Sequence, residues 1–84
     1  YISKNKIEFT PEIDVDKILE LLKGKYQNEQ ITTIDGLKID FKDGWVHLRK
    51  SNTEPIIRIY AESEGKDKAN SFAENMINEI KNLI

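Results

Sequence analysis

The chain has 84 residues, which is enough for one small domain with a single modest hydrophobic core. Its formal net charge of −2 argues against a general nucleic-acid binder and against a surface that docks on anionic lipid, because both partners require a basic face. The absence of cysteine excludes disulfides and thiolate metal sites, and neither an apolar run of membrane-spanning length nor a signal-peptide pattern occurs, so we expect a cytoplasmic location.

A strand and a helix are predicted in the first part of the chain. Residues 6–9 alternate between polar and apolar side chains and stop at Thr10-Pro11, which indicates a first strand. Asp14 is suited to cap the helix that follows, because its carboxylate can accept from a free backbone N–H of the first turn. Gly24 and Lys25 indicate where this helix ends. Its apolar face repeats at three- and four-residue spacing: Val15, Ile18, Leu19, Leu22 and Tyr26.

Four further strands are predicted after this helix, where the period of the apolar side chains changes to two. Asp35-Gly36 and Asp43-Gly44 are strong two-residue hairpin signals and separate the first three of these strands. A polar loop then interrupts the sheet before its last strand. The four predicted strands are residues 31–34, 37–41, 45–49 and 56–62.

The last segment is predicted to form a long amphipathic helix, and residues near 63–66 are expected to cap its start. The element order is therefore strand, helix, four strands, helix. This order predicts an α+β fold in which one antiparallel sheet carries both helices on one face. The apolar stripe of the last helix comprises Ala69, Phe72, Ala73, Met76, Ile77, Ile80 and Leu83.

The only two arginines of the chain, Arg49 and Arg58, flank the polar loop 51–55. Strand alternation predicts that both guanidinium groups point away from the helices. If the two strands pair, the arginines lie side by side and repel each other unless Glu54, Glu62 or a bound anion lies between them. The residues predicted to be buried under the helices are Val46, Leu48, Ile57, Ile59 and Ala61.

Two interpretations of this loop remain open from spacing alone. The arginines can be solvated or paired with local carboxylates, and Ser-Asn-Thr is ordinary turn composition. Alternatively, the forked arginines, the hydroxyls of Ser51 and Thr53, the Asn52 amide and the loop N–H groups can converge on a phosphate. Such a loop alone would hold free phosphate weakly, with a dissociation constant near ~1 mM, which favours a part of a larger site.

The motif Arg-x-Ser-Asn-Thr-Glu-Pro, followed by x-x-Arg-x-x-x-Glu, resembles the phosphate-binding loop of the α-D-phosphohexomutase family. This family includes phosphoglucomutases, phosphomannomutases and amino-sugar phosphate mutases. Asp43-Gly44-Trp45 is also similar to the family pattern, whereas Lys50 departs from it, since the family commonly has a small residue or proline there. The resemblance covers essentially the whole chain, and the motif stands here as Arg49, Ser51, Asn52, Thr53, Glu54, Pro55, Arg58 and Glu62.

The resemblance implies a fold and a place in a larger enzyme. The fold would be the TATA-binding-protein-like β-α-β4-α arrangement, and residues 1–84 would be the C-terminal, fourth domain of the chain. A start at Tyr1 instead of methionine agrees with a cut made inside a longer polypeptide. The partners would be a phosphosugar substrate and the other domains of the same chain, with no nucleic acid and no membrane.

The resemblance also implies a division of labour. Family enzymes interconvert hexose 1-phosphates and 6-phosphates through a bisphosphorylated sugar, using a phosphoserine and Mg²⁺ that belong to other domains. The domain here would be inactive alone, without a catalytic residue or a metal of its own. Its implied task is to bind the phosphate that is not transferred, through Arg49, Ser51, Asn52 and Thr53, with Arg58 supporting or binding directly. Glu54 and Pro55 would order the loop.

Other residues of the exposed sheet face are less informative. Trp45 and Tyr60 share the face of the arginines and are suited to packing against a neighbouring domain or to stacking on a sugar or a base; we favour packing. His47 is interpreted as a half-exposed strand residue without a catalytic partner. The alternative function from another class is a non-catalytic protein-interaction module that uses this open face.

Overall fold

The computed structural model describes residues 1–33, 36–51 and 53–83. Its five strands and two helices follow one another in the predicted order, and the predicted α+β, β-α-β4-α fold is confirmed. The elements are β1 (Ile2–Glu8), α1 (Val15–Lys25), β2 (Gln30–Thr32), β3 (Leu37–Phe41), β4 (Gly44–Lys50), β5 (Ile56–Ser63) and α2 (Lys66–Asn82).

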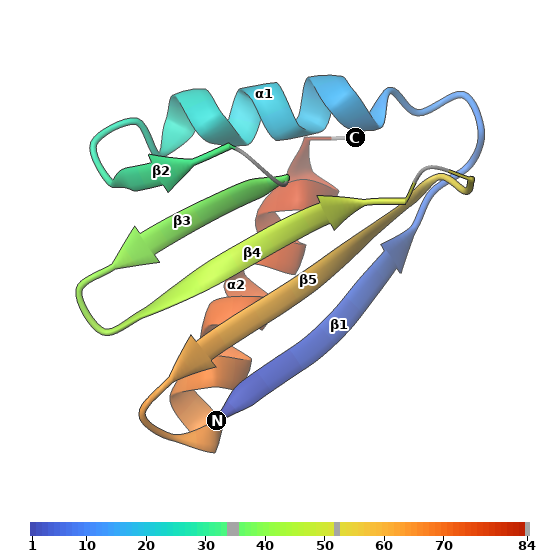
Figure 1. Cartoon of the computed structure of the whole chain (residues 1–84). Coiled ribbons are helices and arrows are strands. Elements are labelled where there is room, and N and C mark those ends of the chain that lie inside the picture. The colour runs from blue at the N-terminus through green and yellow to red at the C-terminus, as the bar shows by residue number, and fades with distance from the viewer. Residues whose placement is uncertain (34–35, 52, 84) are drawn as a thin grey trace.

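The five strands form one antiparallel sheet with the order β1-β5-β4-β3-β2. Figure 1 shows α2 behind the sheet and α1 along its upper border, while the face toward the viewer carries no helix. Strand β1, the first strand in the sequence, lies beside β5, the last strand. The sheet therefore places two segments next to each other that are far apart in the chain.

The core lies between the sheet and the two helices. The five strand residues predicted to be buried are all fully inaccessible, and each helix turns its predicted apolar stripe toward them. Within these stripes, Leu19, Tyr26, Phe72 and Ile77 are only partly buried. Burying an isoleucine or leucine side chain contributes about 1.5–3 kcal/mol, so this shared core is the main favourable term for the fold. Only Leu83, the last residue of the predicted stripe, is exposed.

Both helices begin where the sequence predicted. Asp14 caps α1 as expected, because its Oδ1 accepts from the backbone N–H of Lys17 at 3.1 Å. The N-cap of α2 is Gly65, within the predicted range of residues 63–66, and it offers no side-chain oxygen to the first turn. Ser63, at the start of that range, ends β5 and donates its hydroxyl to the carbonyl oxygen of Asp43 at 2.7 Å.

The first strand is longer than its sequence pattern indicated. It runs from Ile2 to Glu8, not from Lys6 to Phe9, because β5 provides backbone partners from Ile2↔Glu62 to Glu8↔Ile56. Ser3 and Asn5 occupy its inward face, so that apolar alternation is absent where the strand begins. Strand β1 is therefore longer than its alternation of polar and apolar side chains indicates, because it pairs with the long strand β5.

The glycines of the two predicted hairpins are required for different physical reasons. Gly36 has φ of 78°, a conformation that glycine adopts without strain, whereas Ile34 and Asp35 lie outside the described residues. In the second hairpin the turn residues are Lys42 and Asp43, and neither has a positive φ. Gly44 is needed for space, since a Cβ there would clash with the carbonyl oxygen of Glu62 on β5.

Candidate functional site

The two arginines form a direct cross-strand pair. Arg49 on β4 lies opposite Arg58 on β5, and both side chains are exposed on the face away from the helices. The strand-alternation prediction for their position is therefore confirmed. Like charges at directly opposed positions destabilise a sheet, so the placement calls for a compensating anion or solvent.

The two carboxylates considered as counter-ions do not fill that role for Arg58. Glu62 accepts a hydrogen bond from the indole Nε1 of Trp45 at 2.6 Å, and this pair lies four residue pairs from the arginines along the β4–β5 ladder. Among the described residues, the side chain of Arg58 forms no hydrogen bond or ion pair, and the exposed side chain of Glu54 forms none either. Arg58 therefore presents a charge that its described surroundings leave available to a ligand.

Backbone hydrogen bonds support the described residues of the loop between β4 and β5. The Ser51 N–H donates to the carbonyl oxygen of Ile56 at 3.0 Å, which continues the hairpin ladder. The Ile56 N–H donates to the carbonyl oxygen of Glu54 at 2.8 Å, and the Phe9 N–H donates to that of Pro55 at 2.7 Å. The carbonyl oxygens of Glu54 and Pro55 thus both accept backbone hydrogen bonds, and the residue that follows β1 holds the far end of the loop.

The side chain of Ser51 accepts hydrogen bonds from two backbone donors of this loop. Its Oγ accepts from the backbone N–H groups of Thr53 and Glu54, both at 3.3 Å, and lies 3.4 Å from the hydroxyl of Thr53. These N–H···O distances are at the long end for hydrogen bonds, so a charged acceptor can compete for the donors. Asn52, the remaining predicted ligand of the loop, lies outside the described residues.

Lys50 connects the start of the loop to the first helix. It points opposite to Arg49, and its Nζ lies 2.9 and 3.0 Å from the two carboxylate oxygens of Asp16. Asp16 lies in the first turn of α1. Nothing in the local pattern indicates this contact, because the two residues are 34 positions apart.

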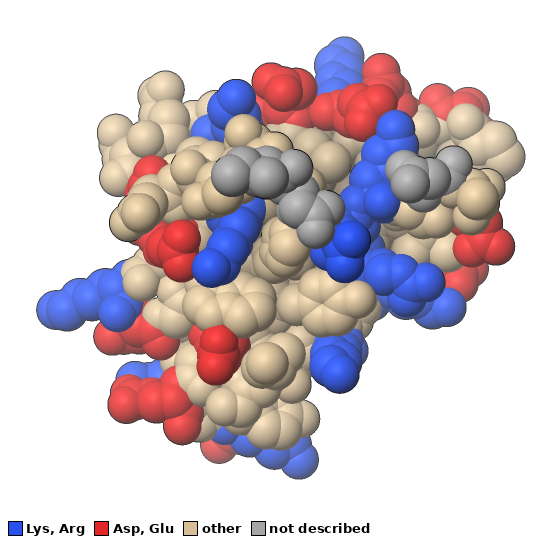
Figure 2. Space-filling view, in the orientation of Figure 1, with Lys and Arg blue, Asp and Glu red and all other residues tan. Residues whose placement is uncertain are grey.

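The open face of the sheet is more basic than the whole chain. Figure 2, in the orientation of Figure 1, shows Lys and Arg side chains above and to the right of an uncharged centre on this face, and Asp and Glu side chains to its left and below it. Lys38 lies 5.1 Å from the centre of the Trp45 ring, while His47 and Tyr60 form the half-buried pair next to the arginines. By strand register, the charged residues of the face are Lys4, Lys6, Lys38, Arg49, Arg58, Glu8, Asp40 and Glu62.

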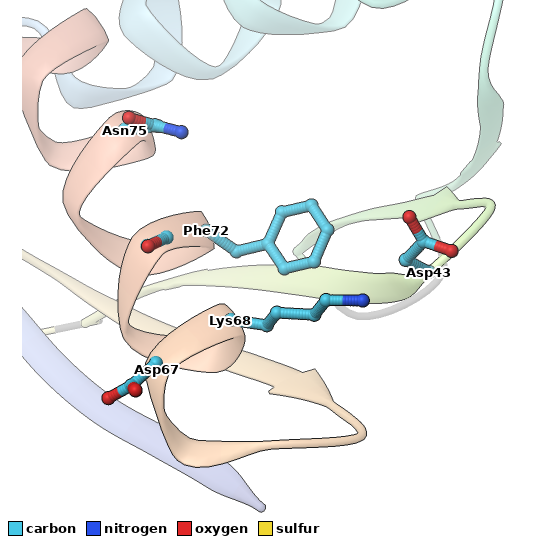
Figure 3. Close-up of a pocket in the computed structure, with 6 residues that line it drawn as sticks. Asp43, Asp67, Lys68, Phe72 and Asn75 are labelled. Atoms are coloured by element: carbon cyan, nitrogen blue, oxygen red, sulfur yellow. The ribbon is translucent and has the colours of Figure 1, made fainter.

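A pocket of about 290 Å³ lies at the other end of the strands (Figure 3). Phe72 and Lys68 project from α2 toward Asp43 in the β3–β4 turn. The Glu64 carboxylate, 2.8 Å from the Lys68 Nζ, and more weakly Asp43 raise the pKa of Lys68. Of the predicted phosphate ligands that the structure describes, none lines this pocket.

The described residues form neither a metal-binding cluster nor a membrane-spanning helix. Residues 1–33, 36–51 and 53–83 contain no group of three or more histidine, cysteine, aspartate or glutamate residues arranged to hold a metal ion. No helix within these ranges combines the length and the apolarity that a membrane crossing requires.

The β-α-β4-α fold, with an Arg-flanked Ser-Asn-Thr-Glu-Pro loop between its last two strands, defines a phosphohexomutase-type C-terminal domain. Residues 6–79 match the family described as "Phosphoglucomutase/phosphomannomutase, C-terminal domain". The chain belongs to this family.

Curated relatives from archaea match along most of the chain. The phosphoglucosamine/phosphogalactosamine mutase of Sulfurisphaera tokodaii is 40% identical over 86 residues, covering 100% of this chain and 18% of the relative. The phosphoglucomutase/phosphomannomutase of Thermococcus kodakarensis is 43% identical over 72 residues, covering 86% of this chain and 15% of the relative. The chain therefore spans less than a fifth of the length of these relatives.

Proposed function

We propose that this chain is the domain that binds the non-transferred substrate phosphate in an enzyme interconverting hexose 1-phosphate and hexose 6-phosphate through a bisphosphorylated intermediate. The observation that carries the proposal is the exposed Arg49–Arg58 pair beside a loop whose N–H and hydroxyl groups meet at Ser51. Family membership supports it, because the matched relatives are named as mutases of sugar phosphates.

The site suits the charge and shape of a phosphate monoester. Such a group carries nearly two negative charges at neutral pH and offers three acceptor oxygens. Arg49 and Arg58 supply forked donors, while Ser51 and Thr53 supply hydroxyls and Asn52 an amide in the proposed complex. A well-made hydrogen bond to a charged partner contributes about 1.5–3 kcal/mol, so a few of them hold a phosphate once the rest of the substrate is bound elsewhere.

The proposed contribution to catalysis is binding and orientation. The loop holds one phosphate while the phosphoryl group moves at the other end of the sugar, so no residue of this chain takes part in bond making. Because the intermediate must turn around between the two half-reactions, the loop recognises phosphate without reading the sugar attached to it. The phosphoserine and the Mg²⁺ that supports its chemistry are proposed to belong to other domains of a longer chain, which would be cytoplasmic.

Phosphate titration of this chain, followed by ¹H–¹⁵N NMR at constant ionic strength, tests the assignment. We expect shifts clustered at residues 49–58, with half-saturation on the order of 1 mM or weaker. Titration with chloride in place of phosphate is the control for ionic strength. The competing function is a protein-interaction module that uses the open sheet face, which carries the half-buried Trp45 and Tyr60. No shift at residues 49–58 in tens of millimolar phosphate would favour that module.

A further inference from the structure

The row that contains the two arginines has a third cationic member. Strand β1 lies on the other side of β5, and its Lys6 is directly opposite Arg58. Arg49, Arg58 and Lys6 therefore stand at neighbouring positions on three adjacent strands, all exposed on the open face. Adjacent strands are about 4.8 Å apart, so a flexible lysine stem reaches the space above its neighbour.

Lys6 has a counter-ion at the edge of the loop. Its Nζ lies 3.2 Å from Oε1 of Glu8, with 57% and 66% of the two side chains exposed. Glu8 pairs with Ile56 in the sheet, and the next residue, Phe9, donates its N–H to the carbonyl oxygen of Pro55. The ion pair therefore lies where β1 meets the base of the loop.

We propose that Lys6 is a third cationic ligand of the substrate phosphate, and that Glu8 is the counter-ion from which it exchanges when phosphate binds. This inference rests on the proposed function and extends its site to a strand outside the loop motif. An exposed ion pair contributes little to stability, so Lys6 leaves Glu8 at small cost. A phosphate dianion next to Arg58 offers the ammonium more negative charge than one carboxylate.

The chemical difference between lysine and arginine gives Lys6 a distinct role. The arginines present planar forks that fix the direction of their hydrogen bonds, whereas an ammonium group is a mobile point charge. The lysine ammonium group can therefore bind the phosphate whichever end of the sugar carries it. Glu8 weakens phosphate binding, because its carboxylate repels the phosphate and forms an ion pair with Lys6 in the free domain.

Opposite effects of two substitutions test the proposal in this chain. Lys6→Gln should weaken inorganic phosphate binding about threefold, and Glu8→Gln should strengthen it about twofold, as measured by NMR titration at ~0.15 M ionic strength. Lys4→Gln is the matched control for Lys6, since Lys4 lies on the same strand and face but about 7 Å further from the loop. Glu20→Gln on the exposed side of α1 is the control for Glu8.

The possible outcomes separate the role of Lys6, the exchange from Glu8 and the proposed function of the loop. Equal effects of Lys6→Gln and Lys4→Gln would mean that only the general field matters and would overturn the role of Lys6. An unchanged affinity in Glu8→Gln would overturn the exchange from Glu8. If phosphate shifts residues 49–58 and Arg58→Ala abolishes those shifts while Lys6→Gln has no effect, the proposed function stands and this inference fails. If the unsubstituted chain shows no phosphate shifts, both fail.

Discussion

The two ends of strand β4 differ in what their residues do. At one end, the exposed Arg49 and Arg58 flank the loop of residues 51–55, in which the hydrogen bonds to Ser51 Oγ are long. At the other end, a two-residue turn packs against an aromatic cluster in which Phe41 stacks on Phe72 at 5.4 Å and meets the edge of Tyr26 at 5.7 Å. One end thus has exposed cations and weakly bonded donors and the other has close packing, so substitutions should affect binding at the first and stability at the second.

The largest effect is expected at the packed end, from Gly44→Ala. The new Cβ would meet the Glu62 carbonyl oxygen and press on the Phe72 ring, and backbone on β5 has little room to move. We expect a loss of about 3 kcal/mol in the free energy of unfolding, measured by urea denaturation of this chain.

The matched control is Gly24→Ala in α1, where a Cβ meets nothing within 4 Å. Because alanine favours a helix more than glycine does, this substitution should stabilise the chain by about 0.5–1 kcal/mol. A Gly44→Ala variant as stable as Gly24→Ala would show that the packed end tolerates added volume, and the contrast between the two ends would be lost.

The second effect is expected at the loop end, from Arg49→Ala in the full-length enzyme. Loss of charge-assisted hydrogen bonds worth about 1.5–3 kcal/mol should lower kcat/KM for the sugar phosphate by roughly 10- to 100-fold. Phosphorylation of the catalytic serine, measured by mass spectrometry, should survive, because that residue is proposed to lie in another domain.

Lys42→Ala is the control for Arg49→Ala, since it removes one positive charge at the opposite end of β4. Steady-state kinetics of the two variants should differ clearly. Unchanged kinetics of Arg49→Ala would contradict the assignment of the loop as the phosphate site.

A smaller effect is expected where the loop meets α1. Lys50→Ala removes the contact with Asp16, an exposed ion pair whose contribution is at most about 1 kcal/mol. The loss in unfolding free energy should shrink as salt screens the pair in the unsubstituted chain. Denaturation at low and high salt measures this difference, and a loss that is independent of salt would mean that the lysine stem, not its charge, supports the loop.

The smallest effect at neutral pH is expected from Tyr26→Phe at the packed end. Burial of the Tyr26 hydroxyl, together with the Glu79 carboxylate beside it, raises the pKa of Tyr26 above its usual value near 10. A pKa raised by folding gives stability that is fully present below the unfolded pKa and is lost as the pH rises toward the folded pKa. The unsubstituted chain should therefore lose stability above about pH 10 more steeply than Tyr26→Phe does.

Thermal unfolding of both chains between pH 8 and about pH 11 checks this expectation, since the range brackets the ordinary tyrosine pKa. All other residues are the same in both chains, so that the difference between the curves reports Tyr26 alone. Parallel curves would place the hydroxyl in ordinary solvent and would weaken the description of this end as closely packed.

Prediction from sequence succeeded where one residue and its near neighbours carry the signal. Asp14 caps α1 because a short carboxylate at that position reaches the free N–H groups of the next turn. Alternation correctly assigned Arg49 and Arg58 to the open face, since side chains of a strand point to opposite sides in turn. Prediction failed for the start of β1, where Ser3 and Asn5 face inward and the strand exists because β5 offers backbone partners.

The sequence by itself determined the family, the element order and the face that carries the loop motif, because these depend on periodicity and on a run of ten neighbouring residues. Only the tertiary structure decided that Lys6 stands opposite Arg58 and that Lys50 reaches Asp16. Such contacts join segments far apart in the chain, and their register follows from how the sheet and the helices bury a common core. The extent of the proposed phosphate site is therefore a property of the folded domain, whereas its central motif is a property of the sequence.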